Sequence, residues 1–249
     1  MRIIVSGVSG EMGKFVLQSV AQHPEMIVVA GIDRNAVEGG PFPVYSNWTS
    51  CSETADVIID FSHHSAVDAM LDYCEKTGTP SVICTTGLSD EQIHRVQTLS
   101  EKVALFRSGN MSVGINLLLD LVARASETLY SSFDIEIIEK HHHRKVDAPS
   151  GTALMLADAA KAAIPETREL SFGRHGNDTK RKSEEIGIHA VRGGTIVGEH
   201  SVIFAGMDEI IEINHTALSR AIFANGAVRA AQFLAAKKTG LYSMKEVLK

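Results

Sequence analysis

The chain has 249 residues, of which 44% are hydrophobic, so it can form one large domain or two modest ones with buried cores. A formal net charge of −6 and an isoelectric point near 6.0 argue against general nucleic-acid binding. No apolar run is long enough to span a membrane, and residues 1–5 enter a strand instead of a signal peptide. Its cysteines, Cys51, Cys74 and Cys84, lack CxxC spacing and indicate reduced thiols in a cytoplasmic protein.

The N-terminal segment has the pattern of a βαβ unit. A short apolar strand at 2–6 runs into the glycine turn Gly7–Gly13 (GVSGEMG), and an amphipathic helix and a second strand at 26–32 follow. Such a turn lets backbone N–H groups approach a dinucleotide pyrophosphate. Asp33 lies about 20 residues later, where an acid hydrogen-bonds an adenosine ribose. A tight turn alone would explain the glycines, but strand, helix and acid together favour dinucleotide binding, with Gly13 assigned to helix–strand packing.

The choice of dinucleotide depends on two neighbouring charges. Asp33 favours the free ribose hydroxyl of NAD, whereas Arg34 beside it can accommodate the 2′-phosphate of NADP. We therefore expect NAD(H) or NADP(H) as cofactor, although Arg34 could also be a solvated loop charge. The glycine spacing is GxxGxxG, and Val8 stands where the usual motif has the first glycine of a pair.

Strands and helices alternate over the first 110 or so residues, which is typical of a Rossmann-like, doubly wound parallel sheet in the α/β class. Residues 39–50 resemble a loop. The expected strands are 55–61, 80–84 and 103–107, and the expected helices are 65–76 and 90–101. Ligands of such sheets lie beyond the carboxyl ends of the strands. The strand-end residues expected at the nicotinamide half are Cys84, Thr85, Thr86, Ser108, Gly109, Asn110 and Met111.

Residues 112–217 are predicted to form a second, α+β domain with a mixed open sheet. Its expected elements are helices 113–128 and 152–163 and strands 133–139, 186–191, 196–204 and 209–216, the last two joined as a hairpin. The polar segment 165–185 reads as a mobile surface loop. A last helix, 220–237, is expected to pack on the first domain, so residues 1–111 and about 218–249 would bind the dinucleotide. The second domain would bind substrate and form oligomers through an uncovered sheet face.

A basic cluster, His141, His142, His143, Arg144 and Lys145, follows the predicted strand 133–139. Ser150 is a candidate N-cap for the next helix, and a helix N-terminus attracts anions. These features predict a site for a small anion, a carboxylate.

Three interpretations of the cluster compete. For a zinc site, neither CxxC nor HExxH completes the ligands, and adjacent histidines on a strand point to opposite faces. A solvated basic loop is the second. The third is a catalytic anion site, in which alternation sends His141 and His143 one way and His142 and Arg144 the other. A histidine suits general acid work, and Lys145 can neutralise a carboxylate or donate a proton.

The string EIIEKHHHRKVDAPSGTA, with GVSGEMG, CTTG, GNMSVGIN and RGGTIVGEHSVIFAG, resembles the 4-hydroxy-tetrahydrodipicolinate reductase (dihydrodipicolinate reductase) family over essentially the whole chain. The resemblance implies NAD(P)H-dependent reduction of 4-hydroxy-tetrahydrodipicolinate, via dihydrodipicolinate, to tetrahydrodipicolinate in diaminopimelate and lysine biosynthesis. It also implies a small cyclic dicarboxylate substrate, no metal and a homotetramer.

The same resemblance assigns roles to residues. His141 would be the proton donor and acceptor, Lys145 a proton donor that contacts substrate, and His142 a substrate ligand. A substrate carboxylate would be held by Ser150, Gly151 and Thr152. The implied cofactor contacts are Gly7, Val8, Ser9, Gly10, Glu11, Met12, Asp33, Arg34, Cys84, Thr85, Thr86, Ser108, Gly109, Asn110 and Met111. The chain departs from the family pattern at Cys84, where glycine is common, and in the order of His143 and Arg144.

Two other functions fit parts of the sequence. A redox sensor would bind the dinucleotide and report its state to another protein, but it needs no proton donor such as the basic cluster. A semialdehyde dehydrogenase would need a nucleophilic cysteine, for which Cys84 is the candidate; with no histidine close in sequence, Cys84 instead indicates a small packed residue.

Overall fold

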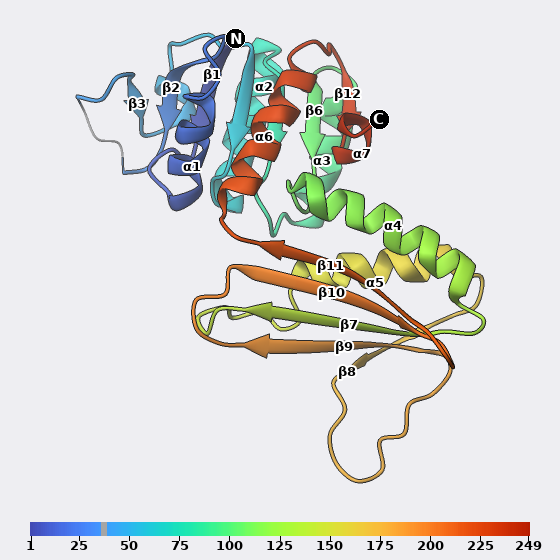
Figure 1. The fold of residues 1–249 in the computed structure, drawn as a ribbon. Coiled ribbons are helices and arrows are strands. Elements are labelled where there is room, and N and C mark those ends of the chain that lie inside the picture. The colour runs from blue at the N-terminus through green and yellow to red at the C-terminus, as the bar shows by residue number, and fades with distance from the viewer. Residues whose placement is uncertain (36–38) are drawn as a thin grey trace. The chain divides into compact units, whose positions relative to one another are not determined.

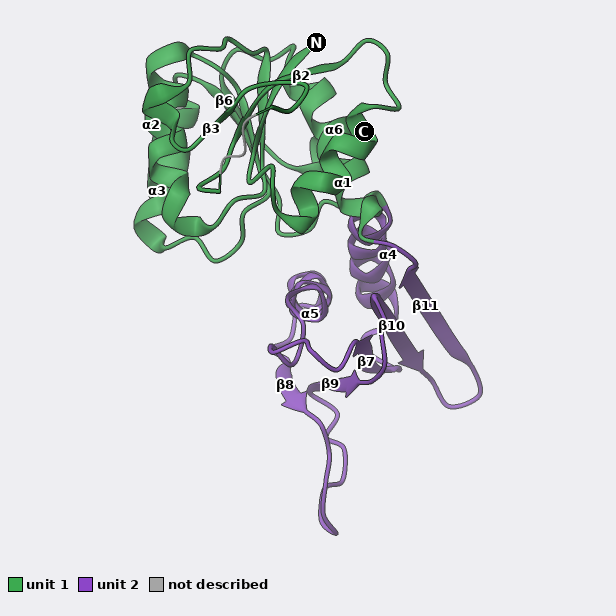
Figure 2. Cartoon of the chain, turned by 90° about the vertical axis from the view of Figure 1, so that its left-hand side faces the viewer, with its two compact units in different colours: residues 1–113, 220–249 green, residues 114–219 purple. Residues whose placement is uncertain are grey.

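The computed structural model describes residues 1–35 and 39–249 and contains two compact units, coloured separately in Figure 2. Unit 1 comprises Met1–Val113 and Arg220–Lys249, and unit 2 comprises Gly114–Ser219. Within the described residues, no helix has both the length and the apolar character needed to cross a membrane.

Unit 1 is built on a seven-stranded sheet in the order β12-β6-β5-β4-β1-β2-β3, and all neighbouring strands are parallel (Figure 1). The strands are β1 (Arg2–Ser6), β2 (Ile27–Ile32), β3 (Val44–Tyr45), β4 (Val57–Asp60), β5 (Ser81–Ile83), β6 (Ala104–Arg107) and β12 (Gly240–Tyr242). Strands such as β4 are buried at every residue, because helices cover both faces of a parallel sheet. The predicted doubly wound sheet is confirmed.

The helices of unit 1 lie on both faces of this sheet (Figure 2). On one face are α1 (Glu11–Val20) and α6 (Ala221–Leu234), and on the other α2 (Val67–Thr77) and α3 (Asp90–Ser100). Each face has its own apolar core. The remaining short helices are η1 (Trp48–Ser50), η2 (His64–Ala66) and α7 (Met244–Val247). The predicted packing of the C-terminal helix on the first domain is confirmed, since α6 contacts α1 and buries seven residues in unit 1.

Unit 2 has a five-stranded mixed sheet in the order β11-β10-β7-β9-β8 (Figure 1). Its strands are β7 (Asp134–His141), β8 (Glu169–Phe172), β9 (Glu185–Arg192), β10 (Gly198–Ala205) and β11 (Ile210–Ala217). β10 and β11 form the predicted antiparallel hairpin, while β7 and β9 are parallel. α4 (Val113–Leu129) and α5 (Gly151–Ala163) pack on one face of the sheet around Ile137, Leu156 and Phe204.

Three short strands and one short helix depart from the sequence-based expectations. β3 and the helix η1 occupy part of the segment predicted as a loop, 39–50, and β8 lies in the predicted loop 165–185. β12, beyond the last predicted helix, pairs with β6. These strands have two to four residues, too few to show a period, and backbone hydrogen bonds to a longer neighbouring strand hold them.

Gly226 in α6 generates a prediction about stability. A Cβ at this position would overlap the carbonyl oxygen of Met111, so the helix can approach that backbone only with glycine. Gly→Ala inside a helix is otherwise favourable by about 1 kcal/mol, whereas overpacking a core costs roughly 1–3 kcal/mol. We expect Gly226→Ala to lower the free energy of unfolding, measured with urea. Gly193→Ala, whose Cβ would meet no atom within 4 Å, is the control and should have little effect. A more stable Gly226→Ala protein would contradict the packing described.

Candidate active site

The glycine turn of unit 1 lies against the end of β4. Gly7 has a φ of +76°, which side chains rarely adopt, and a Cβ there would be 2.6 Å from the Phe61 carbonyl oxygen. β1 and β4 are neighbours at the point where the strand order reverses, and this is where doubly wound sheets bind ligands. The backbone N–H of Ser9 donates to Asp33 Oδ2 at 3.0 Å, which ties the turn to the end of β2.

A cleft of about 550 Å³ opens at this point. Gly7, Ser9, Gly10, Asp33 and Arg34, all predicted from sequence, line it. Sequence reasoning missed the other side of the cleft, which is lined by Asn47, Trp48, Phe61, Ser62, His63 and Ser65. The signal that could have found them is the order of the sheet, because the loop after β4 must face the loop after β1.

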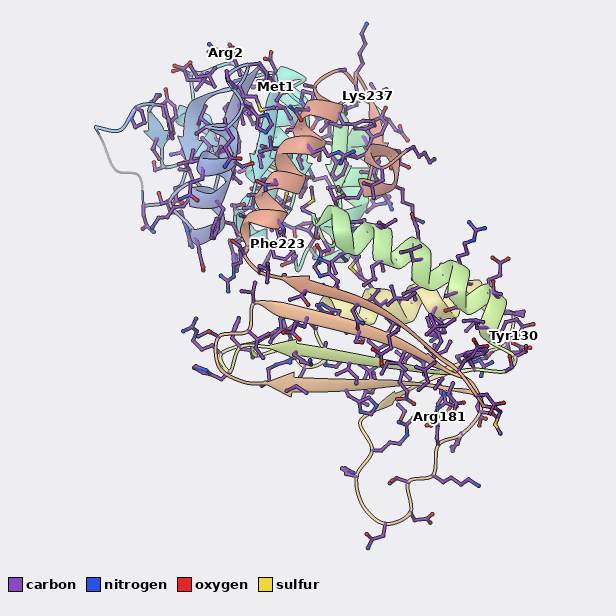
Figure 3. The ribbon with its side chains drawn as sticks, in the orientation of Figure 1. Met1, Arg2, Tyr130, Arg181, Phe223 and Lys237 are labelled. Carbon is purple, nitrogen blue, oxygen red and sulfur yellow. The ribbon has the colours of Figure 1, made fainter. Side chains whose placement is uncertain are left out.

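A second cavity of about 290 Å³ lies in the same unit, and Phe61 lines both. It collects seven of the predicted strand-end and turn residues: Met12, Cys84, Thr86, Ser108, Gly109, Asn110 and Met111. Phe223, labelled at the start of α6 in Figure 3, completes its wall. The cleft and the cavity together offer a glycine-lined and an apolar compartment, which fits the pyrophosphate–adenosine and nicotinamide halves of a dinucleotide.

Three predicted cofactor residues make other contacts. Val8 is 5% exposed and packs over Gly31 of β2, so it fills space that the usual motif leaves empty. Glu11 forms an ion pair with Arg220. Thr85 is buried, and its hydroxyl donates to Asp60 Oδ2 at 2.6 Å.

Cys84 does not have the properties of a nucleophile. The residue is 8% exposed, and burial, with a smaller contribution from Asp60, raises the pKa of its thiol well above the usual value. A thiolate is the reactive form of cysteine, so the structure disfavours the semialdehyde dehydrogenase alternative. Cys51, Cys74 and Cys84 are all free thiols.

In unit 2, β7 carries an acid on its buried face. The strand alternates, so Ile135, Ile137, Glu139 and His141 all point inward. Glu139 is fully buried, and each of its two carboxylate oxygens accepts two hydrogen bonds. Arg192 of β9 donates to each oxygen at 2.7 Å, the Ser150 amide donates to Oε1 at 2.9 Å, and His141 Nδ1 lies 2.6 Å from Oε2.

These bonds keep Glu139 charged. Burial alone would raise the pKa of its carboxyl, but the hydrogen bonds from Arg192, His141 and the Ser150 amide outweigh burial and lower that pKa. A buried carboxylate is tolerated only when paired and hydrogen-bonded, as here. An ionised carboxylate can only accept, so the proton between Glu139 and His141 resides on Nδ1.

Behind His141 lies His200 of β10, another residue that sequence reasoning did not assign. The two rings meet edge to face, with centroids 5.2 Å apart. His200 is 5% exposed, and its Nε2 is 3.0 Å from Ser150 Oγ. Burial, followed by the neighbouring His141, lowers the pKa of His200 to about 4, so this ring is neutral near pH 7.

Ser150 is the N-cap of α5, as predicted, and its Oγ accepts from the Ala153 N–H at 3.2 Å. Its own N–H is bonded to Glu139, and the residue is 2% exposed. The structure thus uses the Ser150 side chain and amide internally, to fix the start of the helix. Gly151 and Thr152 form the first turn, where backbone N–H groups attract anions.

The basic cluster is not an extension of β7. The strand ends at His141, and the Lys145 N–H donates to the His142 carbonyl at 3.1 Å, which closes a turn. The expected alternation through Arg144 is therefore wrong, because the turn replaces extended backbone. His143 Nδ1 lies 2.9 Å from the Gly194 carbonyl oxygen, and Arg144 is exposed.

Lys145 lies on a loop that is hydrogen-bonded to the partner of Glu139, Arg192. Its Nζ is 2.9 Å from Asp147 Oδ1, and its side chain is 21% exposed. The Asp147 carbonyl accepts from Arg192 at 2.7 Å, so the loop that carries Lys145 is tied to the same arginine as Glu139. The site therefore combines a histidine, an ammonium group and a capped helix start, which can bind a carboxylate and transfer a proton. No three His, Cys, Asp or Glu side chains in the described part of the chain are grouped to hold a metal ion.

The low pKa of His200 generates a prediction. An unfolded histidine titrates near 6.5, so the unfolded chain binds this proton more readily than the folded chain, in which the pKa is about 4. The resulting stability is complete above pH 6.5 and is lost as the pH falls toward 4. The free energy of unfolding should fall for both proteins between about pH 7 and about pH 4.5. We expect the fall to be about 2 kcal/mol smaller for His200→Gln, which can still bond Ser150, than for the wild type. Urea unfolding at the two pH values measures this. His94→Gln, at an exposed site, is the control, and an unchanged loss in His200→Gln would refute the assignment.

Comparisons with known proteins agree along the whole chain. Residues 1–111 match the family described as dihydrodipicolinate reductase, N-terminus, and residues 114–248 match its C-terminus. A 4-hydroxy-tetrahydrodipicolinate reductase of Caldanaerobacter subterraneus subsp. tengcongensis is 51% identical over 100% of this chain and 98% of its own, and one of Clostridium novyi is 50% identical with the same coverage. The solved structure of a dipicolinate-bound dihydrodipicolinate reductase from Paenisporosarcina sp. TG-14 superposes with a TM-score of 0.82 at 25% identity, covering 98% of this chain and 97% of that one. The chain belongs to the dihydrodipicolinate reductase family.

Proposed function

We propose that this chain is an NAD(P)H-dependent oxidoreductase that reduces 4-hydroxy-tetrahydrodipicolinate to tetrahydrodipicolinate. The observation that carries the proposal is the arrangement in unit 2. His141, held by the buried Glu139, and Lys145 lie in one hydrogen-bonded cluster with the N-terminus of α5. The 25% identical relative with bound dipicolinate supports a small cyclic dicarboxylate as ligand.

The dinucleotide is assigned to unit 1. Gly7, Ser9 and Gly10 line the cleft at the glycine turn, and Asp33 and Arg34 lie at its ribose end. The cofactor supplies the hydride, and either NADH or NADPH is expected to serve, because Asp33 suits a free 2′-hydroxyl and Arg34 a 2′-phosphate. The apolar cavity with Cys84, Thr86 and Met111 excludes water from the nicotinamide.

The substrate carboxylates are assigned to the cationic cluster. The first turn of α5 at Gly151 and Thr152 holds one carboxylate through backbone N–H groups, and Ser150 caps that turn. Lys145 and His142 contact the substrate. Lys145 exchanges its partner Asp147 for the substrate, which costs little because Asp147 is 59% exposed at its side chain.

The reaction balances with one hydride and one proton. The substrate loses water from the hydroxylated ring carbon to give a conjugated imine, which takes up the hydride from the cofactor and a proton from Lys145 or His141. The net change consumes one NAD(P)H and one proton and releases water. The chain contributes orientation, charge neutralisation and proton delivery, without a metal.

The oligomeric state and location belong to the same proposal. Both helices of unit 2 pack on one face of its sheet, and β11 exposes Ile210 and Ile211. A homotetramer that pairs these surfaces, in the cytoplasm where the three thiols stay reduced, fits these features.

Turnover of the cyclic substrate with NADH or NADPH, followed through loss of the reduced nicotinamide, tests the proposal. We expect Lys145→Ala to lower kcat by about 10²-fold or more, because a general acid typically contributes 10²–10⁴, while NADH still binds with the same Kd. Lys161→Ala, in the last turn of α5, is the matched control and should retain its kcat. An absence of turnover by the wild-type protein would refute the function, and an unchanged kcat in Lys145→Ala would remove Lys145 from the mechanism.

Arg34 generates a second prediction. Arg34 lines the cleft together with Asp33, and of the two cofactors only NADPH has a 2′-phosphate. Loss of a hydrogen bond to a charged group costs about 1.5–3 kcal/mol, so Arg34→Ala should raise KM for NADPH roughly tenfold or more. KM for NADH, measured in parallel, is the internal control and should stay the same. An equal rise for both cofactors would contradict the assignment of Arg34 to the 2′-phosphate.

A further inference from the structure

His141, the proposed proton donor, is hydrogen-bonded to Glu139, a residue to which the proposed mechanism assigns no chemical step. Glu139 is fully buried, and its four hydrogen bonds come from Arg192, Ser150 and His141. A buried ionised carboxylate is costly even when paired, and a hydrophobic residue in its place is often neutral or stabilising. Packing alone therefore does not explain the glutamate.

We infer that the Glu139–Arg192 pair positions the whole proton-transfer site, fixing His141 as the tautomer with hydrogen on Nδ1 and leaving Nε2 as the nitrogen that exchanges a proton with the substrate. This inference rests on the proposed function, because it assigns His141 a proton to transfer. Protonated at Nε2, His141 gives that proton up and becomes a neutral ring that still donates from Nδ1 to Glu139.

The hydrogen bonds of the Glu139–Arg192 pair lead to three different parts of the site. Oε2 of Glu139 holds the ring of His141, Oε1 holds the Ser150 amide at the start of α5, and Arg192 Nη2 also donates to the Asp147 carbonyl in the loop of Lys145. The acid, the helix start and the ammonium group thus share one anchor. Such anchoring matters because a catalytic geometry is effective only when its side chains are held.

The second ring nitrogen of His141, Nε2, faces β10 and is not used by Glu139. On β10, Gly198 faces this nitrogen, and a Cβ there would lie 3.1 Å from it. His200 of the same strand and Lys145 are the further titratable groups near the ring, with Glu139 and Arg192. Since His200 is neutral near pH 7, it does not oppose a positive charge on His141.

The substitution that separates tautomer from packing is Glu139→Gln. Its carbonyl oxygen can still accept from Ser150 and one Arg192 nitrogen, whereas its NH₂ group would occupy the place of Oε2 and donate to His141 Nδ1. We expect the neutral ring then to carry its proton on Nε2. Nitrogen-15 NMR of the histidine rings, recorded without substrate, should show Nδ1–H for His141 in the wild type and Nε2–H in Glu139→Gln.

The kinetic consequence is a split between rate and binding. The kcat of Glu139→Gln should fall roughly 10²-fold, the lower range for loss of an acid–base group, while the Kd for dipicolinate stays the same because the start of α5 keeps its acceptor. Glu136→Gln is the matched control. Glu136 lies on the same strand and also binds a histidine, His189 at 2.8 Å, and two arginines, but on the opposite face. It should change neither the His141 tautomer nor kcat.

The outcomes separate the two proposals. A wild-type ring with its proton on Nε2, or a Glu139→Gln protein with unchanged tautomer or unchanged kcat, would overturn the positioning role. If the wild type shows Nδ1–H but turns over no substrate, the proposed function fails while the assignment of the tautomer stands. Should Glu139→Gln not fold, Gly198→Ala replaces it: we expect an unchanged tautomer with a lower kcat, and an unchanged kcat would overturn the role of Nε2.

Discussion

The ion pair between the buried Glu139 and Arg192 organises unit 2 around the start of α5. The carboxylate of Glu139 has left water entirely, and the two-pronged contact of Arg192, the Ser150 amide and His141 replace the water it lost. With all its acceptor positions occupied, the carboxylate has a single arrangement that satisfies every donor. The orientation of a ring, the start of a helix and the course of a loop all follow from that arrangement. A neutral residue of the same size would leave each of them to weaker contacts.

Unit 1 contains a buried acid as well, and the contrast shows what the arginine does. Asp60, at the end of β4, is fully buried and receives hydrogen bonds from Ser62, Thr85 and Ser6, but it forms no ion pair within residues 1–35 and 39–249. Burial therefore prevails and raises the pKa of Asp60, whereas the pKa of Glu139 is lowered. The hydroxyl donors come from strand ends, so Asp60 joins β1, β4 and β5 beside the cleft at the glycine turn. The neutral donors around Asp60 connect the strands but do not keep its carboxyl ionised. Glu139 stays ionised next to His141 because Arg192 is its partner.

The features that depend only on neighbouring residues could be predicted from the sequence. Periodicity predicts the long strands and helices, and the Ser150 cap needs only its own helix. The roles of Arg192 and His200 could not be predicted from the sequence, because strand pairing brings them to Glu139. In the sheet, His141 lies opposite Arg192, and Glu139 lies opposite His200. One local signal was available. Glu139 occupies an inward position of an alternating strand, between Ile137 and His141, and an acid at such a position has to find a partner.

The two faces of β7 carry similar glutamates that differ in their contact with water. Glu136 and Glu139 each bind a histidine and arginine, yet the side chain of Glu136 is 18% exposed and that of Glu139 is 0% exposed. Arg181, labelled in Figure 3, reaches Glu136 from the segment between β8 and β9, and water screens this partly exposed pair more than it screens Glu139. Water can replace one of the partners of Glu136, whereas it does not reach the side chain of Glu139. Under the proposed function, the ring of His141 is thereby held in one protonation pattern, in which it can serve as an acid.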